Sequence, residues 1–265
     1  MPDMVLPGPV EEASCPANSV NIHTSKIYSA CRDKDCVEDL RVYPTVSSQA
    51  LISGALSVRP SSATLLSADV NVDAISFNRG YYTVDVTYFY RVTGTVFPGG
   101  CEVSGLAVFD KRVILFGSEG SVKVFSSEGR CAGVCTQYDD PVAYVSAVDP
   151  IALSMKLLDC GGGACPDDTV PHIPACIIEA IGEELVMNDC ARRLYVTLGQ
   201  FSVIRLERPS LLTLGDVARF FPDGECTGSS SEDDPCALFS RVDFPVEEFL
   251  PPDRLRERND YQDLV

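Results

Sequence analysis

The chain has 265 residues, of which 45% are hydrophobic and 22% are charged. This composition excludes a wholly disordered protein. Asp and Glu number 38 against 21 Lys and Arg, so the net charge is −17. Binding to nucleic acid or to an anionic membrane surface requires clustered basic side chains, and we expect neither partner.

The N-terminal sequence shows no secretory signal. Residues 1–9 contain neither the positively charged region nor the apolar region that such a signal requires. The longest uncharged run, residues 42–58, is interrupted by Pro44 and by several polar residues. We therefore expect synthesis without a signal peptide and no insertion into a membrane.

Two neighbouring segments predict an antiparallel pair of strands. Residues 66–73 alternate apolar and polar side chains, as a half-buried strand does. Residues 77–80 are typical of a turn, and residues 81–93 alternate again.

The second of these strands has a predicted core face. It consists of Tyr82, Val84, Val86, Tyr88, Tyr90 and Val92. A carboxylate at position 86 should therefore prevent folding, whereas one at Thr83 on the other face should not. Tyr81 and Phe89 lie on that other face, and an exposed aromatic strip there is the alternative to a purely structural role.

Further strands are expected along the chain. Pro98-Gly99-Gly100 predicts a turn, followed by strands over residues 104–116 and 121–126. Residues 194–206 predict another long strand.

Helix signals are few. Residues 212–221 could form a short helix, and residues 177–187 could form a helix or a strand. The pattern predicts a mainly β fold, an antiparallel sandwich or barrel-like core with few short helices. The predicted organisation is a cysteine-containing N-terminal segment (1–40), a β domain (41–158), a Cys/Gly-rich connection (159–190), a second β unit (191–250) and a charged tail (251–265).

Twelve cysteines are the most distinctive feature of the sequence. They are Cys15, Cys31, Cys36, Cys101, Cys131, Cys135, Cys160, Cys165, Cys176, Cys190, Cys226 and Cys236. Most lie beside turn-forming residues, so disulfides are the preferred interpretation, with metal sites or free thiols as alternatives. The pairs expected to close most easily are Cys31–Cys36, Cys131–Cys135, Cys160–Cys165 and Cys226–Cys236.

The metal alternative depends on the two histidines, each of which lies within a group of cysteines. Cys160, Cys165, His172 and Cys176 resemble a zinc site, with zinc as the cofactor, although their spacing is loose. The other group, around His23, has still wider gaps and is the weaker candidate.

Signals for catalysis are absent. Neither histidine lies in a recognisable catalytic motif, and no phosphate-binding glycine loop is present. An acidic loop over residues 223–234 resembles a calcium loop only distantly, because it lacks the bidentate Glu at its last position. We expect no enzymatic activity, no catalytic residue and no cofactor outside the zinc alternative.

Three segments carry a resemblance to a known group of proteins. Residues 28–43, residues 77–86 and residues 108–120 are similar to stretches of uncharacterised cysteine-rich proteins of spore-forming clostridia. The resemblance covers most of the chain but supplies no catalytic or binding motif. It implies a bacterial protein of the spore coat or outer layers, whose thiols oxidise after synthesis in the cytosol.

These observations predict a non-enzymatic structural protein that associates with copies of itself and is cross-linked through cysteines. The expected location is a spore surface or extracellular layer, and the expected partners are further copies and other coat proteins. The alternative is a zinc-dependent binding module built on the residues from Cys160 to Cys176.

Overall fold

The computed structural model describes residues 20–120, 123–124, 137–138, 140–160, 171–187, 192–214 and 242–246, together with Cys236 and Phe239. The strands are β1 (Val20–Pro44), β2 (Ser57–Ala74), β3 (Tyr81–Phe97), β4 (Glu102–Phe116), β5 (Lys123–Val124), β6 (Gln137–Tyr138), β7 (Val142–Ala147), β8 (Ile151–Asp159) and β9 (Arg192–Leu214). The helices are α1 (Val46–Gly54) and α2 (Ala175–Ile181). Neither helix has the length and apolar character needed to cross a membrane, and this holds for the described residues alone.

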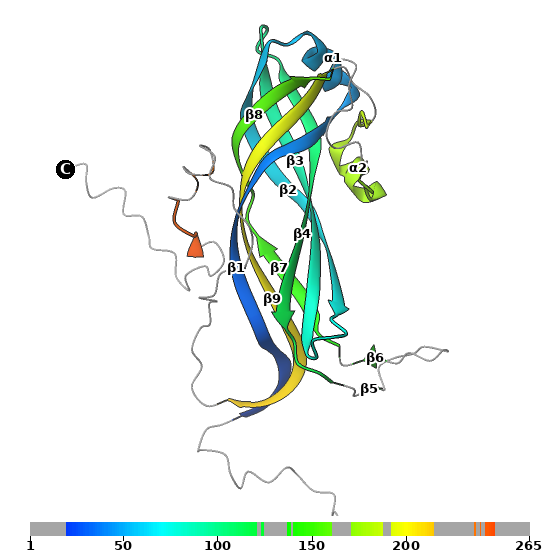
Figure 1. Cartoon of the computed structure of the whole chain (residues 1–265), viewed down its shortest axis with the longest axis vertical. Coiled ribbons are helices and arrows are strands. Elements are labelled where there is room, and N and C mark those ends of the chain that lie inside the picture. Colours follow the sequence, from blue (N-terminus) through cyan, green and yellow to red (C-terminus); the bar gives the residue numbers. More distant parts are fainter. Residues whose placement is uncertain are drawn as a thin grey trace, which may run out of the picture.

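One antiparallel sheet dominates the structure. Its strand order is β2-β3-β4-β1-β9-β7, and β8 also pairs with β9, whereas β5 and β6 form a separate small ribbon. The sheet curls until β2 lies against β8 and β7, so that it is nearly closed into a barrel (Figure 1). The predicted mainly β, barrel-like core with few short helices is therefore confirmed.

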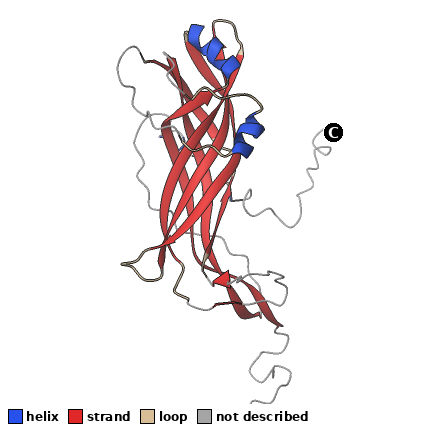
Figure 2. Cartoon of the chain, turned by 90° about the vertical axis from the view of Figure 1, so that its right-hand side faces the viewer, coloured by secondary structure: helices blue, strands red, loops and turns tan. Residues whose placement is uncertain are grey.

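β1 and β9 form the longest pair of the sheet. Their register extends from Val20 opposite Leu214 to Val42 opposite Leu194, and the lower part of this ribbon extends beyond β4 (Figure 1). In Figure 2, strands extend below the main body of the sheet at its lower end. The sheet therefore crosses the predicted boundaries at residues 40 and 190. The segments expected as an N-terminal piece and as part of a second unit are neighbouring strands, with Val42 of β1 and Leu194 and Val196 of β9 in the same core.

The predicted antiparallel pair and its core face are confirmed. β2 pairs with β3 from residue 57 to residue 74, and Val84, Val86 and Tyr88 are fully buried. The structure does not support the alternative of an exposed aromatic strip that includes Phe89. Phe89 is buried with Leu106 and with Ile177 of α2, which covers this part of the sheet.

Other local predictions are confirmed in part. The segments 104–116 and 194–206 are strands, and 177–187 is helical only as far as Ile181. The helix expected over 212–221 is wrong at its start, because residues 212–214 pair as strand with β1. The rest of that segment lies outside the described residues, as does most of 121–126.

Candidate functional site

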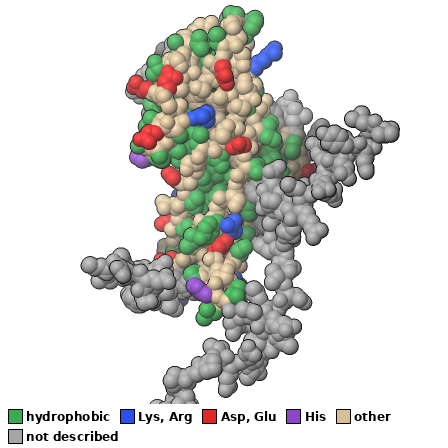
Figure 3. Space-filling view, turned by 180° about the vertical axis from the view of Figure 1, so that it is seen from behind, with side chains coloured by type: hydrophobic (Ala, Val, Ile, Leu, Met, Phe, Trp, Pro, Cys, Tyr) green, Lys and Arg blue, Asp and Glu red, His purple; other side chains and the backbone are tan. Residues whose placement is uncertain are grey.

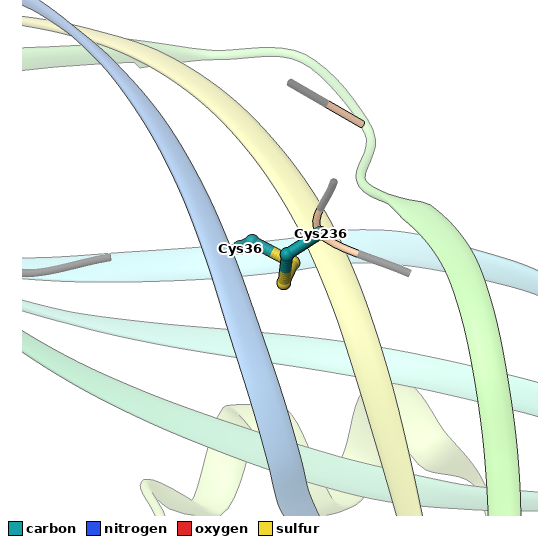
Figure 4. The surroundings of a disulfide bond; sticks show 2 residues. All are labelled: Cys36 and Cys236. Carbon is teal, nitrogen blue, oxygen red and sulfur yellow. A yellow bond between two sulfur atoms is a disulfide. The ribbon is translucent and has the colours of Figure 1, made fainter. Parts of the chain in front are cut away.

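A disulfide joins β1 to the C-terminal part of the chain. Cys36 and Cys236 are bonded across 200 residues of sequence, with Cα atoms 5.5 Å apart (Figure 4). Cys36 lies opposite Gly199 in the β1–β9 register. A link of this span constrains the unfolded chain much more than the short-range pairs predicted from the sequence would.

Aromatic packing accompanies this disulfide. The ring of Phe239 lies 4.7 Å from that of Phe201 on β9, and Phe244 lies 5.3 Å from Phe201. Lys34 on β1 donates to the carbonyl of Val242 at 2.7 Å. A side chain at Gly199 would meet the Phe239 ring at 2.7 Å, so the glycine permits this close approach. The described C-terminal residues thus cover the outer side of β1 and β9.

Two predicted disulfides are wrong. Cys36 pairs with Cys236, which excludes both Cys31–Cys36 and Cys226–Cys236. The physical reason for the first is strand geometry: residues five apart in an extended strand point to opposite faces and are roughly 16 Å apart. Cys31 and Cys160 each take part in a disulfide as well. Cys101 and Cys176 are free and exposed. The remaining candidates, Cys15, Cys131, Cys135, Cys165, Cys190 and Cys226, lie outside the described residues.

The predicted zinc residues do not come together in the part of the chain that is described. Cys160 is committed to a disulfide, and His172 and Cys176 are exposed. Cys165 lies outside the described residues. The metal-ligating group that the described residues do form consists of Cys36, Glu38 and Cys236, and its two sulfur atoms are bonded to each other. A disulfide sulfur is no thiolate, so this group as it stands lacks the ligands that zinc prefers.

A buried charged cluster, which the sequence did not predict, lies inside the barrel. It consists of Asp33 and Asp35 on β1 and Lys111 on β4. The Nζ atom of Lys111 contacts Oδ2 of Asp33 and lies 2.6 Å from both carboxylate oxygens of Asp35. The side chains of Lys111 and Asp33 are each 8% exposed, and that of Asp35 is 19% exposed.

Burial shifts the pKa values of the charged cluster in the directions that favour neutral side chains. Loss of solvation raises the pKa of Asp35 to about 6 and lowers the pKa of Lys111 to about 8. Burial also raises the pKa of Tyr88 to about 12, and the carboxylate of Asp35 contributes to that rise. The cluster holds two acids for one base, which further disfavours a state with every group ionised.

Polar side chains without hydrogen-bond partners surround the charged cluster. The Tyr90 hydroxyl and the Oε1 atom of Gln200 are buried and have no hydrogen-bond partner among the described residues, whereas the buried Tyr88 hydroxyl lies close enough to Ser202 for that hydroxyl to lower its pKa. Asp33 and Asp35 lie opposite Ser202 and Gln200 in the β1–β9 register. Buried polar groups of this kind destabilise a core, so this level of the interior is a functional candidate.

The charged cluster leaves only a weak signal in the sequence. Asp33-Lys34-Asp35 and Asp110-Lys111-Arg112 both look like solvated charge runs. Within a strand, however, residues two apart share a face, and the neighbours Cys31 and Val113 are buried. A prediction of β1 as a strand would therefore have placed both aspartates on the same inward face as Cys31.

Comparison with known proteins gives no relative. No family model, curated protein or solved structure matches this chain. The functional argument therefore rests on the residues themselves.

Proposed function

We propose that this chain is a non-enzymatic structural protein that associates with copies of itself and is cross-linked through cysteines. The observation that carries the proposal is the pair of free, exposed thiols, Cys101 and Cys176, in a chain whose described cysteines are otherwise disulfide-bonded. A bond between molecules requires an accessible thiol, and these two residues meet that requirement.

The surroundings of Cys101 support this proposal. The residue follows the β3–β4 turn at the upper end of the barrel, where hydrophobic side chains reach the surface (Figure 3). Leu56 is 75% exposed and Phe97 is 63% exposed, and the Leu56 amide donates to the Phe97 carbonyl at 2.7 Å. Exposed apolar side chains beside a free thiol are suited to an end-on contact between copies.

Contacts between copies have to overcome their like charge. A net charge of −17 makes copies repel one another. The upper-end surface of Leu56, Phe97 and the nearby Val46 and Leu51 supplies apolar area. The resemblance to proteins of spore-forming clostridia suggests an outer layer of the spore as the place where such contacts form and oxidise.

The test is the size of the purified protein after mild oxidation. We expect disulfide-linked dimers or larger species on a non-reducing gel and in analytical ultracentrifugation, and we expect reductant to dissociate them. A Cys101→Ser, Cys176→Ser double variant should keep the internal disulfides but form no covalent multimers. The matched single variants identify which thiol makes the bond. A wild-type chain that remains monomeric and keeps both thiols free after oxidation would refute the proposal.

A further inference from the structure

The charged cluster bridges a seam in the barrel. β1 and β4 are neighbours in the sheet, but their backbones pair only where residues 42–44 lie opposite residues 105–107. Below this point, within the described part of the chain, β1 pairs on its other edge with β9 and β4 pairs on its other edge with β3. At the level of Asp33 and Lys111, the connection between the two strands is made by side chains.

The amine and the carboxyl of this bridge lie within reacting distance. Nζ of Lys111 touches the carboxyl group of Asp33 and also lies 2.6 Å from both carboxylate oxygens of Asp35. The wall beside them is aromatic, since the Tyr88 ring stacks on Phe109 with centroids 6.1 Å apart. A fixed amine and acid at a largely buried site have a very high effective concentration toward each other.

We propose that Lys111 and Asp33 condense into an intramolecular amide bond, with Asp35 as the group that carries the proton. The bond would join the β4 and β1 side chains covalently across the seam. It requires no oxidant, metal or cofactor.

The reaction is balanced by loss of one water molecule. The carboxylate of Asp35 takes a proton from the Lys111 ammonium, which leaves a neutral amine with a free electron pair. This pair attacks Cγ of the protonated Asp33 carboxyl, and the new C–N bond forms. Asp35 then passes its proton to the departing hydroxyl, the C–O bond breaks, and water leaves. The carboxylate of Asp35 then takes the second amine proton as the carbonyl group re-forms, so the products are the neutral amide, one water molecule and protonated Asp35.

The titration behaviour of the site favours these steps. Burial lowers the pKa of Lys111, which makes its neutral, nucleophilic amine easier to reach, and it raises the pKa of Asp35 to about 6, which makes the Asp35 carboxylate a stronger base than an ordinary aspartate. The groups that face the pair from β3 and β9 are Tyr88, Tyr90, Gln200 and Ser202, and they add no further charge at neutral pH. Asp35 is therefore the acid–base group in contact with the reacting nitrogen.

The amide bond is independent of the proposed self-association. It lies inside one molecule, and reductants that open the Cys36–Cys236 disulfide leave it intact. Condensation would remove one oxygen of Asp33 as water and replace the buried Lys111–Asp33 ion pair by a neutral amide. Most of the free-energy cost of burying these two charges would then disappear.

The decisive measurement is the intact mass of the full-length chain after denaturation, complete reduction and alkylation. We expect a mass lower than that of the sequence by one water molecule. Digestion with trypsin should yield residues 33–34 joined to residues 92–112, because a modified Lys111 is no longer a cleavage site. A wild-type chain with the full sequence mass and a free peptide ending at Lys111 would overturn the proposal.

Variants separate this bond from other losses of water. Lys111→Arg keeps the positive charge but cannot form the amide, so its mass should equal that of its sequence. If the loss persists in Lys111→Arg, the water comes from another reaction and the proposal is wrong. Asp35→Asn should fold with its two partners in place yet condense at least tenfold more slowly in a time course after refolding. Condensation at the wild-type rate would remove Asp35 from the mechanism.

Discussion

The two edges of β1 are held in different ways. Along one edge, the backbone pairs with β9 from Val20 to Val42, with two register shifts. Along the other edge, backbone pairing with β4 is limited to Val42–Pro44, and the Lys111 bridge lies further down. Backbone pairing is available to any sequence with the right alternation, whereas a side-chain bridge requires particular residues at particular positions. The first edge therefore depends on backbone geometry and the second on three particular side chains, and the sequence predicted the strand of β9 but not that of β1.

The largest expected effect concerns the disulfide beside the paired edge. Replacing both Cys36 and Cys236 by Ser should lower the free energy of unfolding by about 5 kcal/mol, because the bond closes a loop of 200 residues. Chemical denaturation without reductant measures this loss. Cys101→Ser is the matched control, since that thiol is free and exposed and its loss should leave the stability unchanged. Equal stability of the double variant and the control would mean that the disulfide contributes nothing.

The next effect concerns the short paired part of the other edge. A Cβ at Gly105 would lie 2.6 Å from the Tyr43 carbonyl oxygen and 2.9 Å from the Pro44 Cα. Gly105→Ala must therefore push β1 and β4 apart, and we expect a loss of about 2–3 kcal/mol in thermal or chemical unfolding.

The control for this variant is Gly54→Ala, because a Cβ at Gly54 meets no atom within 4 Å. We expect that variant to match or exceed the stability of the wild type. If both alanine variants behave alike, β1 and β4 do not approach each other as closely as the structure indicates.

Part of this architecture could be predicted from the sequence. β3 was identified with its buried face because Val84, Val86 and Tyr88 alternate with polar residues within one short segment. The Cys36–Cys236 bond could not be identified, because its partners are brought together only by the fold. Lys111 has charged neighbours on both sides in the sequence, and only the register of β4 turns it inward. Local patterns therefore revealed β3 and parts of β2, β4 and β9 but not β1, β7 or β8, while the sites depend on contacts distant in sequence.

The third prediction concerns the pH dependence of the charged cluster. Burial raises the pKa of Asp35 from 3.8 to about 6. Because the folded-state pKa lies above the unfolded value, the folded chain binds more protons between these pH values. The stability from protonated Asp35 is fully present below about pH 4 and is lost as the pH rises to about 6. We expect this contribution to be about 2 kcal/mol, since each pKa unit corresponds to about 1.4 kcal/mol and part of the side chain is solvated.

The matched variant for this measurement is Asp35→Asn, which is neutral at every pH, and both chains carry Lys111→Arg so that neither can form the amide bond. The difference in unfolding free energy between the chain with Asp35 and the Asp35→Asn chain should change between pH 4 and pH 6. The chain with Asp35 should become less stable relative to the variant as the pH rises. Other carboxyl groups titrate in both proteins and cancel in the difference. A difference that stays constant over this range would show that Asp35 titrates as it does in water.

The smallest expected effect lies where β1 ends and α1 begins. Thr45 caps α1, since its hydroxyl oxygen accepts from the Ser48 amide at 3.3 Å, and its own amide donates to the Ser104 carbonyl at 3.1 Å. Thr45→Ala removes the cap but keeps the backbone hydrogen bond to Ser104 of β4, so we expect the free energy of unfolding to fall by about 1 kcal/mol.

Ser53→Ala is the control, because Ser53 is exposed and its hydroxyl donates only to the Gln49 carbonyl within the same helix. Hydrogen exchange should show faster exchange of the α1 amides in Thr45→Ala while the β1–β9 amides remain protected. Faster exchange of both groups would instead mean that the end of the seam and the paired edge unfold as one unit.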